Sequence, residues 1–199
     1  MAVMPDFHFD EKENRMALVR GFLNAIGEDP NRPGLAETPR RVSEAWEEWF
    51  AGYDVDPDSL YKCFGDGAPG ENSDEMVLEV NIPIHSFCEH HLAPIVGVAH
   101  IAYIPEKRIV GLSKLARVAD AFARRLQVQE RLTNQIADSI ERNLSPQGVG
   151  VVITAEHFCM CTRGVKLGGV KTTTSALRGA IKNEPEARAE FLQLVQMTK

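Results

Sequence analysis

Apolar residues return every three to four positions in several stretches of the chain, which is the spacing of amphipathic helices. Gly27 follows the first of these stretches and is typical of a helix end. Thr38 followed by Pro39 is typical of a helix start, and Ser113 can cap a later helix. The expected helices cover residues 11–26, 38–49, 113–122, 128–144 and 184–196.

Other stretches alternate apolar and polar residues or are continuously apolar, as β-strands are. Helices and strands come in small groups instead of alternating one by one, so the sequence predicts an α+β fold with an antiparallel sheet. The expected strands cover residues 77–84, 95–104, 148–155 and 172–174, and His157 and Cys159 follow directly at the end of the third.

The division of the chain follows from the same pattern. Residues 1–53 form an N-terminal helical region, and residues 76–199 contain the whole expected sheet. Between them, residues 54–75 are acidic and rich in Gly and Pro, which is typical of a loop.

Composition narrows the class of protein. A chain of 199 residues with 44% hydrophobic residues can bury one good core. Its net charge of −6 argues against general nucleic-acid or membrane-surface binding, so an anionic ligand needs a local basic pocket. Neither a membrane-spanning apolar run nor a secretion signal is seen, which predicts a cytoplasmic protein whose four cysteines are thiols or metal ligands.

Cysteine and histidine gather in two short segments, residues 86–91 and 157–161. Cys88, His91 and Cys159 offer two thiolates and one imidazole, a set that leaves one position of a tetrahedral zinc ion open for chemistry. The close Cys159 and Cys161 pair differs from a structural zinc knuckle, so we do not expect both to bind one metal. Buried thiols and surface imidazoles are the alternative, and the ligand types constrain the metal without fixing its identity.

His90 and His157 stand beside the expected ligands and can move protons near neutral pH. If the chain stays extended, His157 and Cys159 share one face of their strand. The alternative is that these histidines only support the ligands or are satisfied in the core.

The motifs along the chain resemble those of the GTP cyclohydrolase I family, in family order and from about Thr38 to the C-terminus. They are Cys88-Glu89-His90-His91 and residues 111–117, 124–132, 146–151 and 155–157. The resemblance implies a tunnelling fold in residues 76–199, with helices on one face of the antiparallel sheet. In this fold, subunits join their sheets into a barrel and pack as a toroidal homodecamer. It also implies one zinc ion per subunit and sites at subunit interfaces.

The implied activity is that of a zinc-dependent hydrolase. Water activated by the metal adds to C8 of the guanine ring of GTP, the ring opens, and that carbon leaves as formate. The ribose then rearranges to give 7,8-dihydroneopterin triphosphate, the first step of tetrahydrofolate and pterin biosynthesis. His90 and His157 are the expected general acids and bases, and the resemblance associates Ser113 with the ribose rearrangement.

Substrate binding is expected from a carboxylate and several cations. Glu130 can accept both N–H donors on the pyrimidine edge of guanine, with Gln129 assisting. The triphosphate needs cations and backbone donors, which a helix start supplies. The resemblance assigns phosphate binding to Lys114, Arg117 and Arg163, with Arg41 contributing from a neighbouring subunit. Solvated surface charges are the alternative for each of these residues.

The sequence departs from the family pattern after Cys159. Cys161-Thr162 replaces the usual Thr-Met, and a Gly occupies the usual proline position in residues 166–170. Glycine gives the backbone there more freedom, and Cys161 suggests a disulfide with Cys159 under oxidation.

Two other functions remain open from sequence alone. A zinc nucleobase deaminase also combines Cys, His and Glu, but its H-x-E and P-C-x-x-C signature is absent. A non-catalytic, oligomeric purine- or pterin-binding paralogue with a structural zinc ion is the second alternative.

Overall fold

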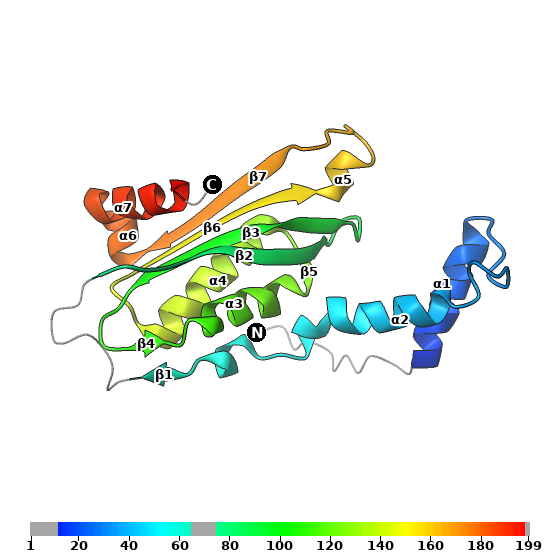
Figure 1. The fold of residues 1–199 in the computed structure, drawn as a ribbon, viewed down its shortest axis with the longest axis horizontal. Helices are drawn as coiled ribbons and strands as arrows, with labels where there is room; N and C mark the ends of the chain where they lie inside the picture. The colour runs from blue at the N-terminus through cyan, green and yellow to red at the C-terminus, as the bar shows by residue number, and fades with distance from the viewer. Residues whose placement is uncertain (1–11, 65–74, 198–199) are drawn as a thin grey trace. The chain divides into compact units, whose positions relative to one another are not determined.

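The computed structural model describes residues 12–64 and 75–197. The chain divides into two compact units, Met1–Phe50 and Ala51–Lys199 (Figure 1). Residues 65–74 of the expected loop and residues 1–11 of the expected helical region lie outside the described residues. Within the described part, no helix combines the length and apolar character that crossing a bilayer requires.

The first unit is a pair of helices, α1 (Lys12–Ala25) and α2 (Thr38–Trp49). Both agree with the expected ranges to within a residue at each end. Gly27 has φ +87° and its N–H is bonded near the end of α1, so glycine ends this segment as predicted. Helix α2 starts at Thr38, but Glu37 occupies the cap position and no side chain caps it.

The second unit is built on a sheet with strand order β5-β2-β3-β6-β7. Neighbouring strands in this sheet are antiparallel except for the short parallel pair of β2 with β5. The strands are β2 (Val77–Cys88), β3 (Pro94–Ile104), β5 (Leu126–Gln127), β6 (Gly148–His157) and β7 (Lys171–Arg178). A separate two-stranded sheet pairs β1 (Cys63–Phe64) with β4 (Ile109–Val110). The two-residue strands escaped prediction because they are too short for a hydrophobic period.

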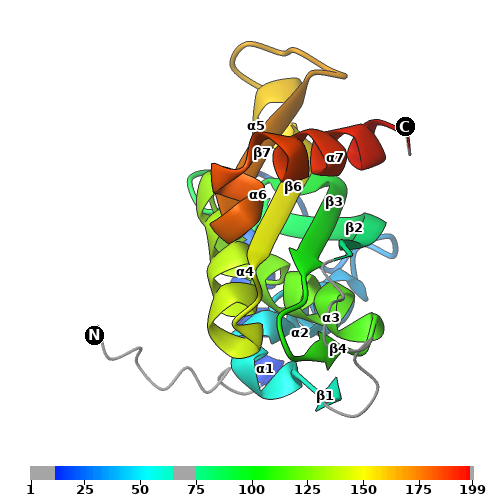
Figure 2. The same ribbon diagram turned by 90° about the vertical axis from the view of Figure 1, so that its left-hand side faces the viewer.

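One face of the large sheet packs against α3 (Ser113–Ala123) and α4 (Gln129–Leu144) (Figures 1 and 2). Alternate strand residues such as Ile101 and Ile153 point into this core and are fully buried, as is Ile136 of α4. The α+β class with a largely antiparallel sheet is therefore confirmed.

The opposite face of the sheet carries the C-terminal helices α6 (Gly179–Asn183) and α7 (Pro185–Gln196) at one end (Figure 2). Phe191 is fully buried there against Ala102 and Val152. The expectation of helices on one face thus describes α3 and α4 and omits α6 and α7. Gly150 makes this packing possible, because a Cβ on it would lie 2.9 Å from the Phe191 ring.

A short 3₁₀ helix, Pro57–Leu60, is fastened to α4 by the carboxylate of Asp58. This carboxylate accepts hydrogen bonds from Ser139 (2.9 Å), Asn143 (2.8 Å) and Arg142 (2.7 and 2.8 Å). Burial works to raise the pKa of Asp58, but the bonds from Arg142, Ser139 and Asn143 outweigh it and the pKa is lowered.

Several strands end beside one another at one end of the sheet. Cys88 at the end of β2 pairs with Gln127 of β5, and His157 at the end of β6 pairs with Ile95 of β3. Residues distant in sequence are therefore brought to one place by the strand order.

Candidate functional site

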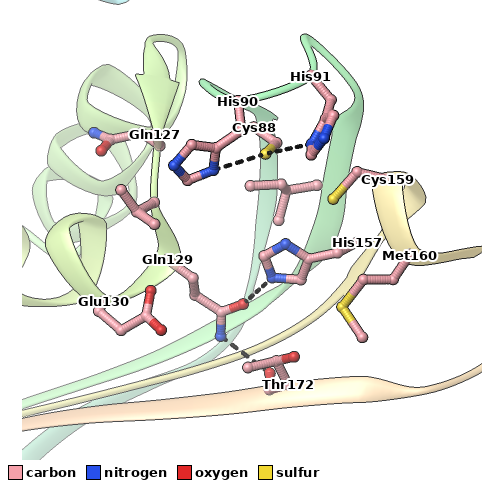
Figure 3. A pocket seen from close by; sticks show the side chains of 12 residues that line it. Cys88, His90, His91, Gln127, Gln129, Glu130, His157, Cys159, Met160 and Thr172 are labelled. Atoms are coloured by element: carbon pink, nitrogen blue, oxygen red, sulfur yellow. Dashed lines mark hydrogen bonds between the residues drawn. The ribbon is translucent and has the colours of Figure 1, made fainter. Parts of the chain in front are cut away.

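A cavity of about 230 Å³ opens at this end of the sheet (Figure 3). Its walls come from the ends of β2 and β6, the start of β3, the β5–α4 junction, α5 (Phe158–Cys161) and β7. The lining residues are Cys88, His90, His91, Ile95, Gln127, Val128, Gln129, Glu130, His157, Cys159, Met160 and Thr172.

Three of these residues could hold a metal ion. The ligand atoms of Cys88, His91 and Cys159 all lie within 4.8 Å of one another, with 4.0 Å between Cys88 Sγ and His91 Nδ1. Thiolate and imidazole are ligands that suit zinc and related transition metals. Burial and the neighbouring Cys88 sulfur raise the pKa of the Cys159 thiol. A bound cation would oppose this shift and favour the deprotonated form of both thiols.

A tight turn brings the first two of these residues together. The Cys88 N–H donates to the Ala93 carbonyl and the Leu92 N–H donates to the Cys88 carbonyl, both at 2.8 Å. Leu92 takes a left-handed conformation with φ +52°, which is uncommon for leucine. Glu89, inside the turn, forms an ion pair with Arg131 of α4, which ties the turn to that helix.

The third residue arrives differently from the sequence-based expectation. Strand β6 ends at His157, and Cys159 lies in the short helix α5. The two residues therefore do not share a strand face, and the helical turn carries the Cys159 sulfur to the cavity. Cys161 points elsewhere, with its sulfur 3.1 Å from both Glu156 Oε1 and the His157 carbonyl. Burial and the Glu156 carboxylate raise the pKa of the Cys161 thiol.

His157 is held by Gln129 in the wall of the cavity (Figure 3). Gln129 Oε1 lies 2.7 Å from His157 Nε2, while its Nε2 donates to Ile153 O, Thr172 O and Thr174 Oγ1. Because the amide nitrogen must face these acceptors, the amide oxygen faces the imidazole. His157 therefore carries its proton on Nε2 when neutral, which leaves Nδ1 as an acceptor.

The expected role of Gln129 was substrate binding. In the structure its side chain is 1% exposed and its polar atoms are occupied by other protein groups. Burial lowers the pKa of His157, and the charge of Glu130 partly opposes this shift. His90 is more open, with 60% of its side chain exposed and its Nδ1 3.6 Å from Cys88 Sγ.

Glu130 stands in the first turn of α4, beside Gln129, and its exposed carboxylate borders the cavity (Figure 3). Gln127, Met160 and Thr172 also line the cavity but were not selected from sequence. They carry no distinctive spacing, and their places follow from the strand order and from α5.

The expected phosphate-binding residues lie in different parts of the structure. Arg163 follows α5 and its charge acts on the Cys159 thiol. Ser113, Lys114 and Arg117 begin α3, whose opposite end leads to β5, so about 16 Å of helix separates Ser113 from the cavity end (Figure 1). Ser113 is the first helical residue and Leu112 occupies the cap position, in contrast to the predicted cap. Arg41 lies exposed on α2 in the first unit.

Comparison with known proteins gives full-length relatives. The family model for GTP cyclohydrolase I matches residues 16–196. The chain is 53% identical to GTP cyclohydrolase 1 of Acetivibrio thermocellus over 186 residues, which cover 93% of this chain and 97% of that protein. It is 54% identical to GTP cyclohydrolase 1 of Corynebacterium glutamicum over 191 residues, 94% of each chain. Identity to the Nitrosospira multiformis protein of the same name is 51%, over 87% of this chain and 90% of that one.

Proposed function

This chain belongs to the GTP cyclohydrolase I family, and on that basis we propose that it converts GTP to 7,8-dihydroneopterin triphosphate and formate. The reaction is the first step of pterin and tetrahydrofolate biosynthesis. The observation that carries the proposal is the convergence on one cavity of a Cys₂His cluster, two further histidines and a carboxylate. We assign the chemistry to residues 76–199.

Cys88, His91 and Cys159 are the residues that would hold zinc, one ion per subunit. Their donor atoms fit that ion in type and number, since three protein ligands leave a coordination position for a reacting molecule. When bound, zinc supplies Lewis-acid activation of water near neutral pH. Four free cysteines suit a reducing compartment, so we place the activity in the cytoplasm.

Glu130 provides the recognition of guanine. Its carboxylate, at the open border of the cavity, can accept the two adjacent N–H groups of the guanine edge. Adenine lacks this pair of donors and would leave the carboxylate unpaired, which costs affinity.

His157 and His90 move protons at the ring nitrogens. Gln129 holds the Nε2 proton of His157, so Nδ1 is the atom that exchanges protons. We therefore assign Gln129 to positioning His157. His90 sits on the exposed side of Cys88, where it can reach solvent and substrate together.

The triphosphate is bound by cations from more than one copy of the chain. We assign Arg163 to the same subunit as the metal ligands. Lys114 and Arg117 lie at the start of α3, and it is the other end of this helix that faces the cavity of their own subunit. A neighbouring subunit would supply these two together with Ser113, and Arg41 would come from a neighbour as well. Strand β7 is an edge of the sheet, which supports joining of sheets into the family's barrel and toroidal decamer.

The test follows formate release and pterin absorbance after the zinc-loaded protein is mixed with GTP. Cys88→Ser should abolish both signals, whereas Cys63→Ser, at an exposed cysteine outside the cavity, should leave them unchanged. Ammonia release without formate would indicate a deaminase. Tight GTP binding with no product would indicate the non-catalytic paralogue, and equal activity in Cys88→Ser would refute the metal mechanism.

A further inference from the structure

The carboxylate of Glu156 joins the two ends of the loop that connects β6 to β7. Its Oε1 accepts a hydrogen bond from the Gly169 backbone N–H at 2.7 Å and lies 3.1 Å from the Cys161 sulfur. Glu156 precedes His157 in β6, so strand alternation places its side chain on the face opposite the cavity. It is not among the residues that line the cavity.

The loop, residues 162–170, is exposed along its whole length and bends sharply. Gly164, Lys166 and Gly169 have φ of +59°, +53° and +78°. A loop of this composition loses much conformational entropy when it is fixed in one shape. Two backbone bonds contribute, from Leu167 N to Met160 O at 2.9 Å and from Lys166 N to Arg163 O at 3.2 Å.

Glu156 is well suited to fix this loop. Hydrogen bonds from Gly169 and Cys161 lower the pKa of the Glu156 carboxyl group, so it is ionised at neutral pH. Bonds to a charged acceptor are stronger than neutral ones. Cys161 acts here as a hydrogen-bond donor from α5, the same short helix that carries Cys159.

We propose that Glu156, with Cys161 as its partner, is a positioning residue that fixes the 162–170 loop and so holds Arg163 beside α5, whose Cys159 and Met160 line the cavity. The inference rests on the proposed function, in which Arg163 binds the phosphates of GTP. It also gives Cys161 a role, because its sulfur is directed to Glu156 at the position where the family usually has another residue. The bonds of Glu156 thereby offset the backbone freedom that the Gly168-Gly169 pair introduces.

Kinetics of Glu156→Ala test the proposal. Glu156→Ala removes the bonds from Gly169 and Cys161 and frees the loop that carries Arg163. We expect KM for GTP to rise about tenfold, with kcat within twofold of the unmodified protein. Inhibition by guanosine, which lacks phosphates, should be unchanged. Combining Glu156→Ala with Arg163→Ala should give no higher KM than Arg163→Ala alone, since Glu156 acts through Arg163.

Conservative variants distinguish the loss of a hydrogen bond from the loss of side-chain volume. Cys161→Ser keeps a donor and should retain the KM of the unmodified protein, whereas Cys161→Val should raise it. Glu156→Gln keeps a hydrogen-bond acceptor but loses the charge. Its KM for GTP should lie between those of the unmodified protein and Glu156→Ala. Glu190→Ala, at an exposed glutamate of α7, is the matched control and should have no effect.

Pterin formation by the unmodified protein and the KM of Glu156→Ala test the proposed function and the positioning role separately. If the unmodified protein forms no pterin from GTP, the function is wrong. If it forms pterin and Glu156→Ala leaves KM within twofold, the positioning role is overturned. A fall in bound zinc and kcat at constant KM would also overturn it, because that result indicates general damage to the metal centre.

Discussion

Replacing Gln129 by methionine tests whether this residue acts through His157. Methionine keeps the length of the side chain and removes its polar atoms. Gln129 lines the cavity, and because methionine is similar in size the shape of the cavity should change little. We expect a protein that still binds metal through Cys88, His91 and Cys159 but turns over GTP slowly.

The size of the effect follows from the contacts. The variant loses the bonds from the amide nitrogen to Ile153 O, Thr172 O and Thr174 Oγ1, and the bond of its oxygen to His157 Nε2. At about 1 kcal/mol for each net hydrogen bond, and with two N–H groups shared among three acceptors, we expect a loss of about 3 kcal/mol in the free energy of unfolding. Misplacing a general acid–base group should lower kcat about 10²-fold.

The assay compares kcat in four proteins: unmodified, Gln129→Met, His157→Ala and the double variant. If Gln129 serves only to place His157, the double variant is no slower than His157→Ala, so the two effects are not additive. Urea unfolding gives the change in stability. Gln193→Met, at an exposed position in α7, should leave kcat and stability unchanged.

Two results would refute this reasoning. One is a kcat of Gln129→Met within threefold of the unmodified value despite the loss of stability. The other is a double variant slower than His157→Ala by the full factor of the Gln129 change, which would mean that Gln129 contacts the substrate itself.

Three further variants have defined outcomes. Glu130→Gln should lower kcat/KM for GTP about 10²-fold through loss of the charged bidentate acceptor, and steady-state kinetics with an unchanged value would contradict its role in guanine recognition. The lowered pKa of Asp58 means that its contribution to stability is present above the unfolded pKa and lost as pH falls through the folded pKa. Asp58→Asn should therefore cost about 1 kcal/mol in urea unfolding at pH 7 and less at pH 3, and an equal cost at both would contradict the ion-pair explanation. Gly150→Ala should destabilise by about 1–3 kcal/mol because its Cβ meets the Phe191 ring at 2.9 Å, whereas Gly168→Ala, with no atom within 4 Å, should melt like the unmodified protein.

Much of the secondary structure could be predicted because its signals are local. The helix that begins at Thr38 and the helix that ends at Leu144 agree with their expected ranges because apolar periodicity and end residues act within a few turns. Cys88 and His91 could likewise be paired from sequence, since a separation of three positions fits one tight turn. The candidate chemistry followed from residue types that are rarely found together by chance.

Contacts between distant segments were decided only in three dimensions. Gln129 and His157 are separated by 28 positions, and their bond depends on α4 packing against β6 and β7. The short helix α5, the placing of α7 on the second face of the sheet and the tie from Glu156 to Gly169 have no periodic signal. Sequence by itself determined which segments form helices and strands and which chemical groups are present, because both depend on neighbours along the chain. Tertiary structure decided which of those groups meet, because meeting depends on strand order, register and packing, which short-range patterns do not encode.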